Sequence, residues 1–160
     1  MMGCCTVRPV PNFPVRALTS ATSSTACSEI GGLVYASALA AHVGVLLALI
    51  REAGKLPPPT FSVTKYSSHI SSSRKVREKR IEMERDVVCR GASVVVVDDV
   101  LTMGNTLFAV LQLLRKAGVD AEDVDGMVVA KFPFHRGRDL LRRLGFGGIK
   151  IQSLLVLGGA

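Results

Sequence analysis

The sequence predicts an α/β fold, with a mostly parallel sheet flanked by helices, and three observations carry that prediction. Strand-like and helix-like patterns alternate along residues 29–160, as in α/β domains. The segment SVVVVDDV (93–100) is apolar on both faces, as a central strand of a parallel sheet requires. After it, apolar residues recur every three or four positions from Leu107 to Leu114, which indicates one face of a helix. A chain of 160 residues, 48% of them hydrophobic, can bury the core of one domain.

The elements before the central strand follow from local patterns. Residues 32–44 predict a helix that packs through small side chains, and residues 45–52 predict a buried strand. Three prolines make GKLPPPT (54–60) a rigid connection without helix. Residues 61–80 form a long polar segment, which in a compact domain is usually functional or disordered. Alternating side chains predict an edge strand at residues 81–88.

The chain ends in a second strand–helix–strand unit. We expect a strand at residues 124–132, a short basic helix at 135–145 and a final strand at 149–157. The helix should turn three leucines inward: Leu140, Leu141 and Leu144. Its arginines fit a solvated face or a contact with a second copy of the chain: Arg136, Arg138, Arg142 and Arg143.

Residues 1–28 look irregular and are expected to be partly disordered. Three prolines fall within residues 9–14, and ALTSATSSTACS (17–28) has too few large apolar residues for a buried strand. Two arginines and no acid precede Glu29, so a mitochondrial presequence stays an alternative. The predicted domain therefore covers residues 29–160.

Cysteine usage and hydropathy predict a cytoplasmic protein. The four cysteines show neither a CxxC pair nor metal-binding spacing, which is typical of reduced thiols inside a cell. No apolar run reaches the roughly 18 residues of a membrane helix.

The net charge of +7 favours anionic partners such as nucleotides, sugar phosphates or nucleic acid. The excess is concentrated in SSSRKVREKR (71–80), which also fits a solvated charged face. With no Trp, two Tyr and no known nucleic-acid-binding motif, specific nucleic-acid binding is not expected.

Asp98 and Asp99 form an acidic pair at the carboxyl end of the central strand, where α/β sheets bind ligands. The turn LTMGNT (101–106) then leads into a helix, whose N-terminal N–H groups favour a phosphate. The carboxylates fit sugar hydroxyls or a Mg²⁺ ion that also meets the ligand. A P-loop NTPase would need a GxxxxGK[ST] motif that this chain lacks, and a receiver domain would carry its acids near the N-terminus. The remaining alternative is that the pair only caps the strand.

VVVVDDVLTMGNT (94–106) resembles the phosphoribosyl-pyrophosphate (PRPP) binding signature of type I phosphoribosyltransferases. Three further segments resemble the adenine phosphoribosyltransferase family: EIGGLVYASALA (29–40), LIREAGKLPPPT (49–60) and YSSHIS (66–71). The resemblance covers residues 29–132, and VPNFPV (10–15) is similar to part of that family's N-terminal hood.

The resemblance implies transfer of a 5-phosphoribosyl group from PRPP to a purine base, adenine first, with release of pyrophosphate and help from Mg²⁺. Asp98 and Asp99 would hold the ribose hydroxyls and face the metal indirectly. Arg51 and Lys55 would bind pyrophosphate, and His69 takes the place of the family's loop glutamate, where it could act as acid or base. The 5-phosphate would lie in the turn made by Leu101, Thr102, Met103, Gly104, Asn105 and Thr106. A homodimer is also implied.

Departures from the family pattern raise a second hypothesis, an inactive protein that binds a ligand or regulates. Gly31 stands where the family has arginine, Glu52 where it has lysine, Met103 where it has threonine and Asn105 where it has glycine. The N-terminal part is shorter than the family's, so we expect the hood and the first core strand to be incomplete.

Overall fold

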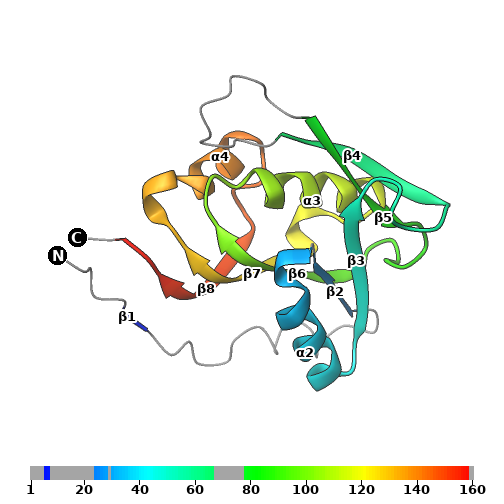
Figure 1. Cartoon of the computed structure of the whole chain (residues 1–160), viewed down its shortest axis with the longest axis horizontal. Helices are drawn as coiled ribbons and strands as arrows, with labels where there is room; N and C mark the ends of the chain where they lie inside the picture. Colours follow the sequence, from blue (N-terminus) through cyan, green and yellow to red (C-terminus); the bar gives the residue numbers. More distant parts are fainter. Residues whose placement is uncertain (1–5, 8–23, 29, 67–77, 159–160) are drawn as a thin grey trace.

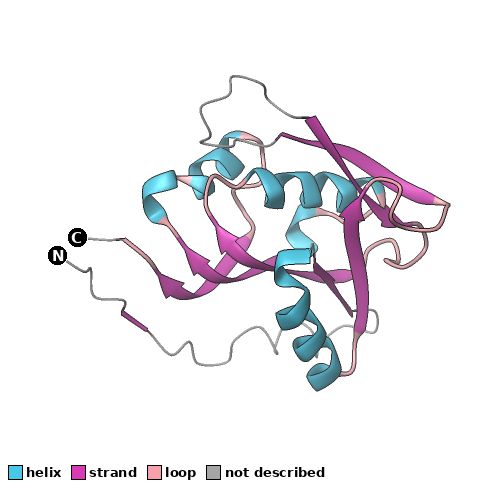
Figure 2. Ribbon diagram, viewed as in Figure 1, coloured by secondary structure: helices cyan, strands magenta, loops and turns pink. Residues whose placement is uncertain are grey.

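The computed structural model describes residues 6–7, 24–28, 30–66 and 78–158. Its centre is an eight-stranded sheet in the order β1-β8-β7-β6-β2-β3-β5-β4, with helices on both faces (Figures 1 and 2). The strands are β1 Thr6–Val7, β2 Ser24–Ser28, β3 Leu46–Glu52, β4 Thr60–Tyr66, β5 Glu78–Glu84, β6 Ser93–Leu101, β7 Val124–Lys131 and β8 Lys150–Val156. The helices are η1 Ile30–Gly32, α2 Leu33–Val43, α3 Asn105–Lys116, η2 Ala121–Asp123, η3 Pro133–His135 and α4 Gly137–Arg143.

The predicted α/β fold with a mostly parallel sheet is confirmed. Strands β3, β2, β6, β7 and β8 run parallel, while β1, β5 and β4 add antiparallel pairs at the two ends. The central strand β6 packs on both sides, because its side chains alternate between faces. Val94 and Val96 join the larger core with α3 and α4, whereas Val95 and Val97 join a smaller core with α2.

The expectation that residues 17–28 cannot supply a buried strand is wrong. Residues 24–28, within the segment expected to be irregular, form β2 in the middle of the sheet between β6 and β3. Ala26 on this strand is completely buried. Large side chains are not needed here, because β2 bonds to a parallel neighbour on each side and small residues let α2 pack closely through Ala36 and Ala40. The hood-like residues 10–15 lie outside the described residues.

Both described ends of the polar segment at 61–80 are strand, since residues 61–66 belong to β4 and residues 78–80 to β5. Val63 is buried there, and Lys116 Nζ on α3 donates a hydrogen bond to the carbonyl oxygen of Ser62 at 2.8 Å. The predicted edge strand at 81–88 is instead the internal strand β5, and β4 forms the edge. The alternating pattern indicates a strand, but it does not show which strands lie beside it.

The end of α4 also differs from the prediction. Leu141 is buried as expected, but Leu144 is 42% exposed because the helix stops at Arg143. Phe146 takes the core position and meets Phe108 edge to face, with ring centroids 5.7 Å apart. Within the described ranges, no helix has both the length and the apolarity needed to cross a membrane.

Candidate phosphate and sugar site

The two acidic residues at the end of β6 lie on opposite faces of the strand, as consecutive strand residues do. Asp98 is half-buried and lines a cavity of about 230 Å³ on the α3 side. Asp99 is exposed and lies against Gly31, where its Oδ1 is 2.8 Å from the position a Cβ would take. The two aspartates are adjacent in the sequence, but of the two only Asp98 lines this cavity.

The predicted phosphate turn forms the floor of the same cavity. Gly104 has φ of +82°, the left-handed conformation that glycine adopts without steric cost, and α3 begins at the next residue. No side chain caps this end of α3. Because the first N–H groups of a helix lack intrahelical partners, this end suits an anion. The cavity-lining residues are Lys65, Tyr66, Asp98, Val100, Leu101, Thr102, Met103, Gly104, Asn105, Thr106, Leu107 and Val128.

Lys65 is a cation that the sequence analysis missed. It lies near the end of β4 and lines the cavity together with the neighbouring Tyr66. Its ammonium group complements an anionic ligand at the α3 terminus. In TFSVTKY (60–66), Lys65 stands two positions after the buried Val63 and therefore lies on the same face of β4.

Arg51 and Lys55 do not line this cavity. Arg51 is half-buried on β3, two strands away from β6, and its buried Nε has no hydrogen-bond partner among the described residues. Lys55 is exposed in the turn between β3 and β4. The two cations therefore lie on β3 and in the turn after it, outside the lining of this cavity. His69 lies outside the described residues.

Glu82 is a second residue that the sequence analysis missed, and it fixes the turn that carries Lys55. It is 6% exposed, and its Oε1 accepts hydrogen bonds from the backbone N–H groups of Lys55 and Leu56, both at 2.9 Å. The bond from Leu56 is the main cause that lowers the pKa of Glu82, against the opposing effect of burial. Glu82 is also the register partner of Arg51 across β3 and β5. A glutamate between the apolar residues Ile81 and Met83 is the sequence signal.

Comparison with known proteins decides the family. Residues 26–131 match the model of the phosphoribosyl transferase domain. The chain belongs to the phosphoribosyltransferase family. It is 36% identical to the adenine phosphoribosyltransferase of Roseiflexus sp. over 118 residues, covering 74% of this chain and 63% of that protein. With the mouse (Mus musculus) adenine phosphoribosyltransferase it shares 32% identity over 140 residues, covering 82% of this chain and 73% of the relative.

A solved structure supports the same fold. The crystal structure of the adenine phosphoribosyltransferase of Giardia lamblia, complexed with 9-deazaadenine, superposes with a TM-score of 0.75. The match covers 96% of this chain and 94% of that one at 20% identity, so it speaks for the phosphoribosyltransferase fold alone. The chain spans 63% of the length of the Roseiflexus relative.

Two departures from the phosphoribosyltransferase pattern have structural consequences. At Gly31, the Asp99 carboxylate occupies the space into which a side chain would project. Glu52 forms an ion pair with Lys79, with Nζ and Oε1 2.7 Å apart. The hydrogen bond from Lys79 is the main cause that lowers the pKa of Glu52. The negative charge of Glu52 is thus compensated by the ammonium group of Lys79 on the neighbouring strand β5.

Proposed function

We propose that the protein transfers the 5-phosphoribosyl group of PRPP to a purine base, with adenine as the preferred base, and releases pyrophosphate. The observation that carries this proposal is the cavity that combines Asp98 with the turn at 101–106 and the start of α3. A carboxylate beside an anion-binding helix end suits a ligand with hydroxyl groups next to a phosphate. The 32–36% identity to adenine phosphoribosyltransferases supports the choice of reaction and base.

Each part of the site has a role in this proposal. Asp98 accepts hydrogen bonds from the ribose hydroxyls, and the turn binds the 5-phosphate with Lys65 as a nearby cation. Arg51 and Lys55 stabilise the charge that develops on the pyrophosphate leaving group. Asp99, on the opposite face of β6, is a second proposed acceptor for the ribose hydroxyls. His69 is kept as a proposed acid or base.

The residues present fit a Mg²⁺ ion that arrives with the substrate. Asp98 offers an oxygen ligand on the cavity wall, and Asp99 follows it in the chain. In the described part of the chain, no cluster of three or more His, Cys, Asp or Glu side chains would hold a metal alone. Mg²⁺ commonly binds one or two carboxylates and completes its shell with substrate phosphates and water. When bound, the ion would neutralise negative charge on the pyrophosphate group.

Turnover tests the reaction directly. Purified protein incubated with PRPP, Mg²⁺ and radiolabelled adenine should form labelled AMP and an equal amount of pyrophosphate. An Asp98→Asn variant with unchanged thermal stability should lose most of this activity, and hypoxanthine and guanine serve as competing bases. A folded wild-type protein that forms no nucleotide from any of the three bases would contradict the proposed reaction.

A protein that binds PRPP without turnover is the second candidate. Gly31 favours it, because this position has no cationic side chain and the Asp99 carboxylate lies beside it. Binding of PRPP by calorimetry, combined with no AMP formation, would support this candidate over the first.

We also propose a cytoplasmic homodimer in which α2 contacts a second copy. This helix is apolar on nearly all sides, yet only Ala36 and Ala40 on it are buried. Val34 is 76% exposed, and Leu46, just after the helix, is 65% exposed. An exposed apolar surface of this kind can be buried against the same surface of a second copy of the chain.

A further inference from the structure

The first residue of α4, Gly137, lies directly against the phosphate turn. Gly137 is buried, and a Cβ at this position would overlap the carbonyl oxygen of Thr102 and come within 3.0 Å of the Gly104 nitrogen. The contact is mutual, since a Cβ at Gly104 would lie 2.8 Å from the Gly137 carbonyl oxygen. Two backbone segments that are far apart in the sequence therefore touch without any side chain between them.

A short connection from β7 through η3 positions Gly137 at this contact, and backbone hydrogen bonds hold it. The Phe132 N–H donates to the Leu101 carbonyl oxygen at 3.0 Å, which ties the end of β7 to the end of β6. The 3-10 helix η3 follows, and Arg136 then takes φ of +53°, a conformation that few residues other than glycine adopt. The direction of the chain at Gly137 is thus set by the residue just before it.

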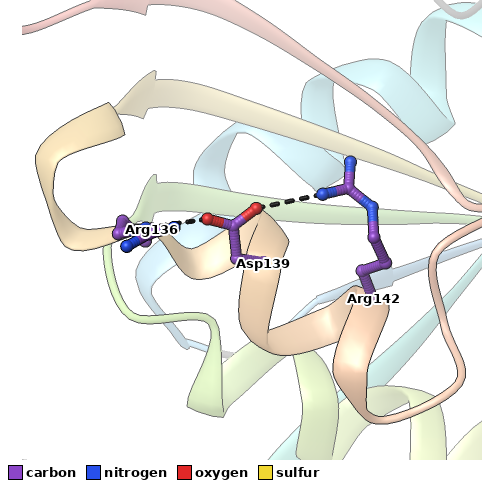
Figure 3. Close-up of polar contacts among 3 residues, drawn as sticks. All are labelled: Arg136, Asp139 and Arg142. Atoms are coloured by element: carbon purple, nitrogen blue, oxygen red, sulfur yellow. Dashed lines mark hydrogen bonds and ion pairs between the residues drawn. The ribbon is translucent and has the colours of Figure 1, made fainter.

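Arg136, Asp139 and Arg142 form a three-residue clamp at the start of α4 (Figure 3). Asp139 Oδ2 lies 2.8 Å from Arg136 Nε, and its Oδ1 lies 3.0 Å from Arg142 Nη1. The Asp139 N–H also donates to the Arg136 carbonyl oxygen at 3.0 Å. Both arginines are more than 70% exposed, so the ion pairs themselves add little stability. Their effect is to fix the start of α4 relative to its last turn.

We propose that Gly137 is a positioning residue that sets the shape of the phosphate turn, and that the Arg136–Asp139–Arg142 clamp holds it in place. The role given to the turn rests on the proposed function. A methyl group at residue 137 would push Thr102 and Gly104 toward the cavity, because α4 is anchored in the core through Leu141. Binding of pyrophosphate at Arg51 and Lys55, two strands away, should not change.

The test compares Gly137→Ala with Gly148→Ala. Gly148 is the matched control, because a Cβ there meets open space and its φ is not in the left-handed range. In ¹⁵N-labelled protein, Gly137→Ala should shift the backbone amide resonances of residues 102–106, whereas Gly148→Ala should leave them unchanged. By calorimetry, Gly137→Ala should weaken AMP binding on the order of tenfold or more and leave pyrophosphate affinity unchanged.

Asp139→Ala provides a second variant that keeps the buried backbone contact. It should weaken AMP binding by a smaller factor, about two- to threefold, with pyrophosphate affinity again unchanged. Unshifted turn resonances in a folded Gly137→Ala protein would overturn the inference, as would equal losses of AMP and pyrophosphate affinity. Failure of the wild type to bind AMP would instead contradict the proposed function, while the amide shifts would still decide whether Gly137 shapes the turn.

Discussion

Asp98 and Asp99 are neighbours in the chain, but only Asp98 lines the cavity beside the phosphate turn. Asp99 lies on the other face of β6, against Gly31. Adjacent residues of a strand cannot point to the same face, so a ligand in this cavity meets the two carboxylates unequally. This asymmetry gives the pair a simple test.

Asp98→Asn should weaken PRPP binding more than Asp99→Asn does. Loss of a charged hydrogen-bond acceptor at a sugar hydroxyl costs about 1.5–3 kcal/mol, which corresponds to roughly 10- to 100-fold in affinity. The exposed Asp99 should change affinity by about threefold or less. Calorimetric titration of both variants measures the difference, and equal losses would show that the ligand does not sit in this cavity.

Glu82 accepts hydrogen bonds from the turn that carries Lys55, so replacing Glu82 should affect the proposed pyrophosphate site. Glu82→Ala leaves the N–H groups of Lys55 and Leu56 without their acceptor and should cost about 1–3 kcal/mol of stability. Glu82→Gln is the matched control, because its amide oxygen can accept both bonds. Urea unfolding and pyrophosphate titration should show larger effects for alanine than for glutamine, and the reverse order would contradict this role.

The ionised form of Glu82 also predicts a pH dependence. Hydrogen bonds hold its folded pKa below the ordinary glutamate value of about 4.3, so its contribution is complete above that pH. It is lost as the pH falls through the lowered folded pKa. The stability difference between wild type and Glu82→Gln should therefore shrink on acidification below about pH 4.3. A difference that grows in acid would indicate that the carboxyl group is bound in its protonated form.

At the scale of elements, strands and helices with a strong apolar period could be predicted from the sequence. Those whose burial depends on neighbouring elements could not. The segment from Ser93 to Lys116 combines an unbroken apolar run with a clear helical period, so β6, α3 and the turn between them were expected. The composition of β2 gives no such signal, because its burial comes from the strands on both sides. The sequence of β4 does not show that Lys65 reaches the cavity, because the cavity forms only where β4 lies near the turn after β6. In the site, the turn and Asp98 were therefore predictable, whereas Lys65, Glu82 and Gly137 depend on how distant segments meet.

The position of β2 predicts that its small side chains are required. Ala26→Leu would force extra volume between the sheet and its helix layer and should destabilise the protein by about 1–3 kcal/mol. Ala53→Leu, at an exposed turn position, should be nearly neutral. Urea denaturation measures both variants, and equal stabilities would mean that β2 is not part of the core.

At the scale of the whole molecule, the exposed apolar side of α2 predicts self-association. Val34→Glu should shift the protein toward monomer, because it places a charge within the proposed contact. Phe134→Glu is the control, since Phe134 is 87% exposed at η3 and outside α2. Light scattering after gel filtration reports the mass, and a monomeric wild type at all concentrations would rule out the dimer.

The whole molecule has the fold of the phosphoribosyltransferase family, and we propose that the cavity beside Asp98 binds a phosphorylated sugar, so substrate binding is the most direct test. The measurement is a calorimetric titration with PRPP, with and without Mg²⁺, on the wild type and an Asp98→Asn/Asp99→Asn variant. We predict that the wild type binds PRPP, that binding requires Mg²⁺, and that the double variant loses it. A folded wild-type protein that shows no binding, or a double variant that binds equally well, would contradict the assignment of this cavity as a sugar-phosphate site.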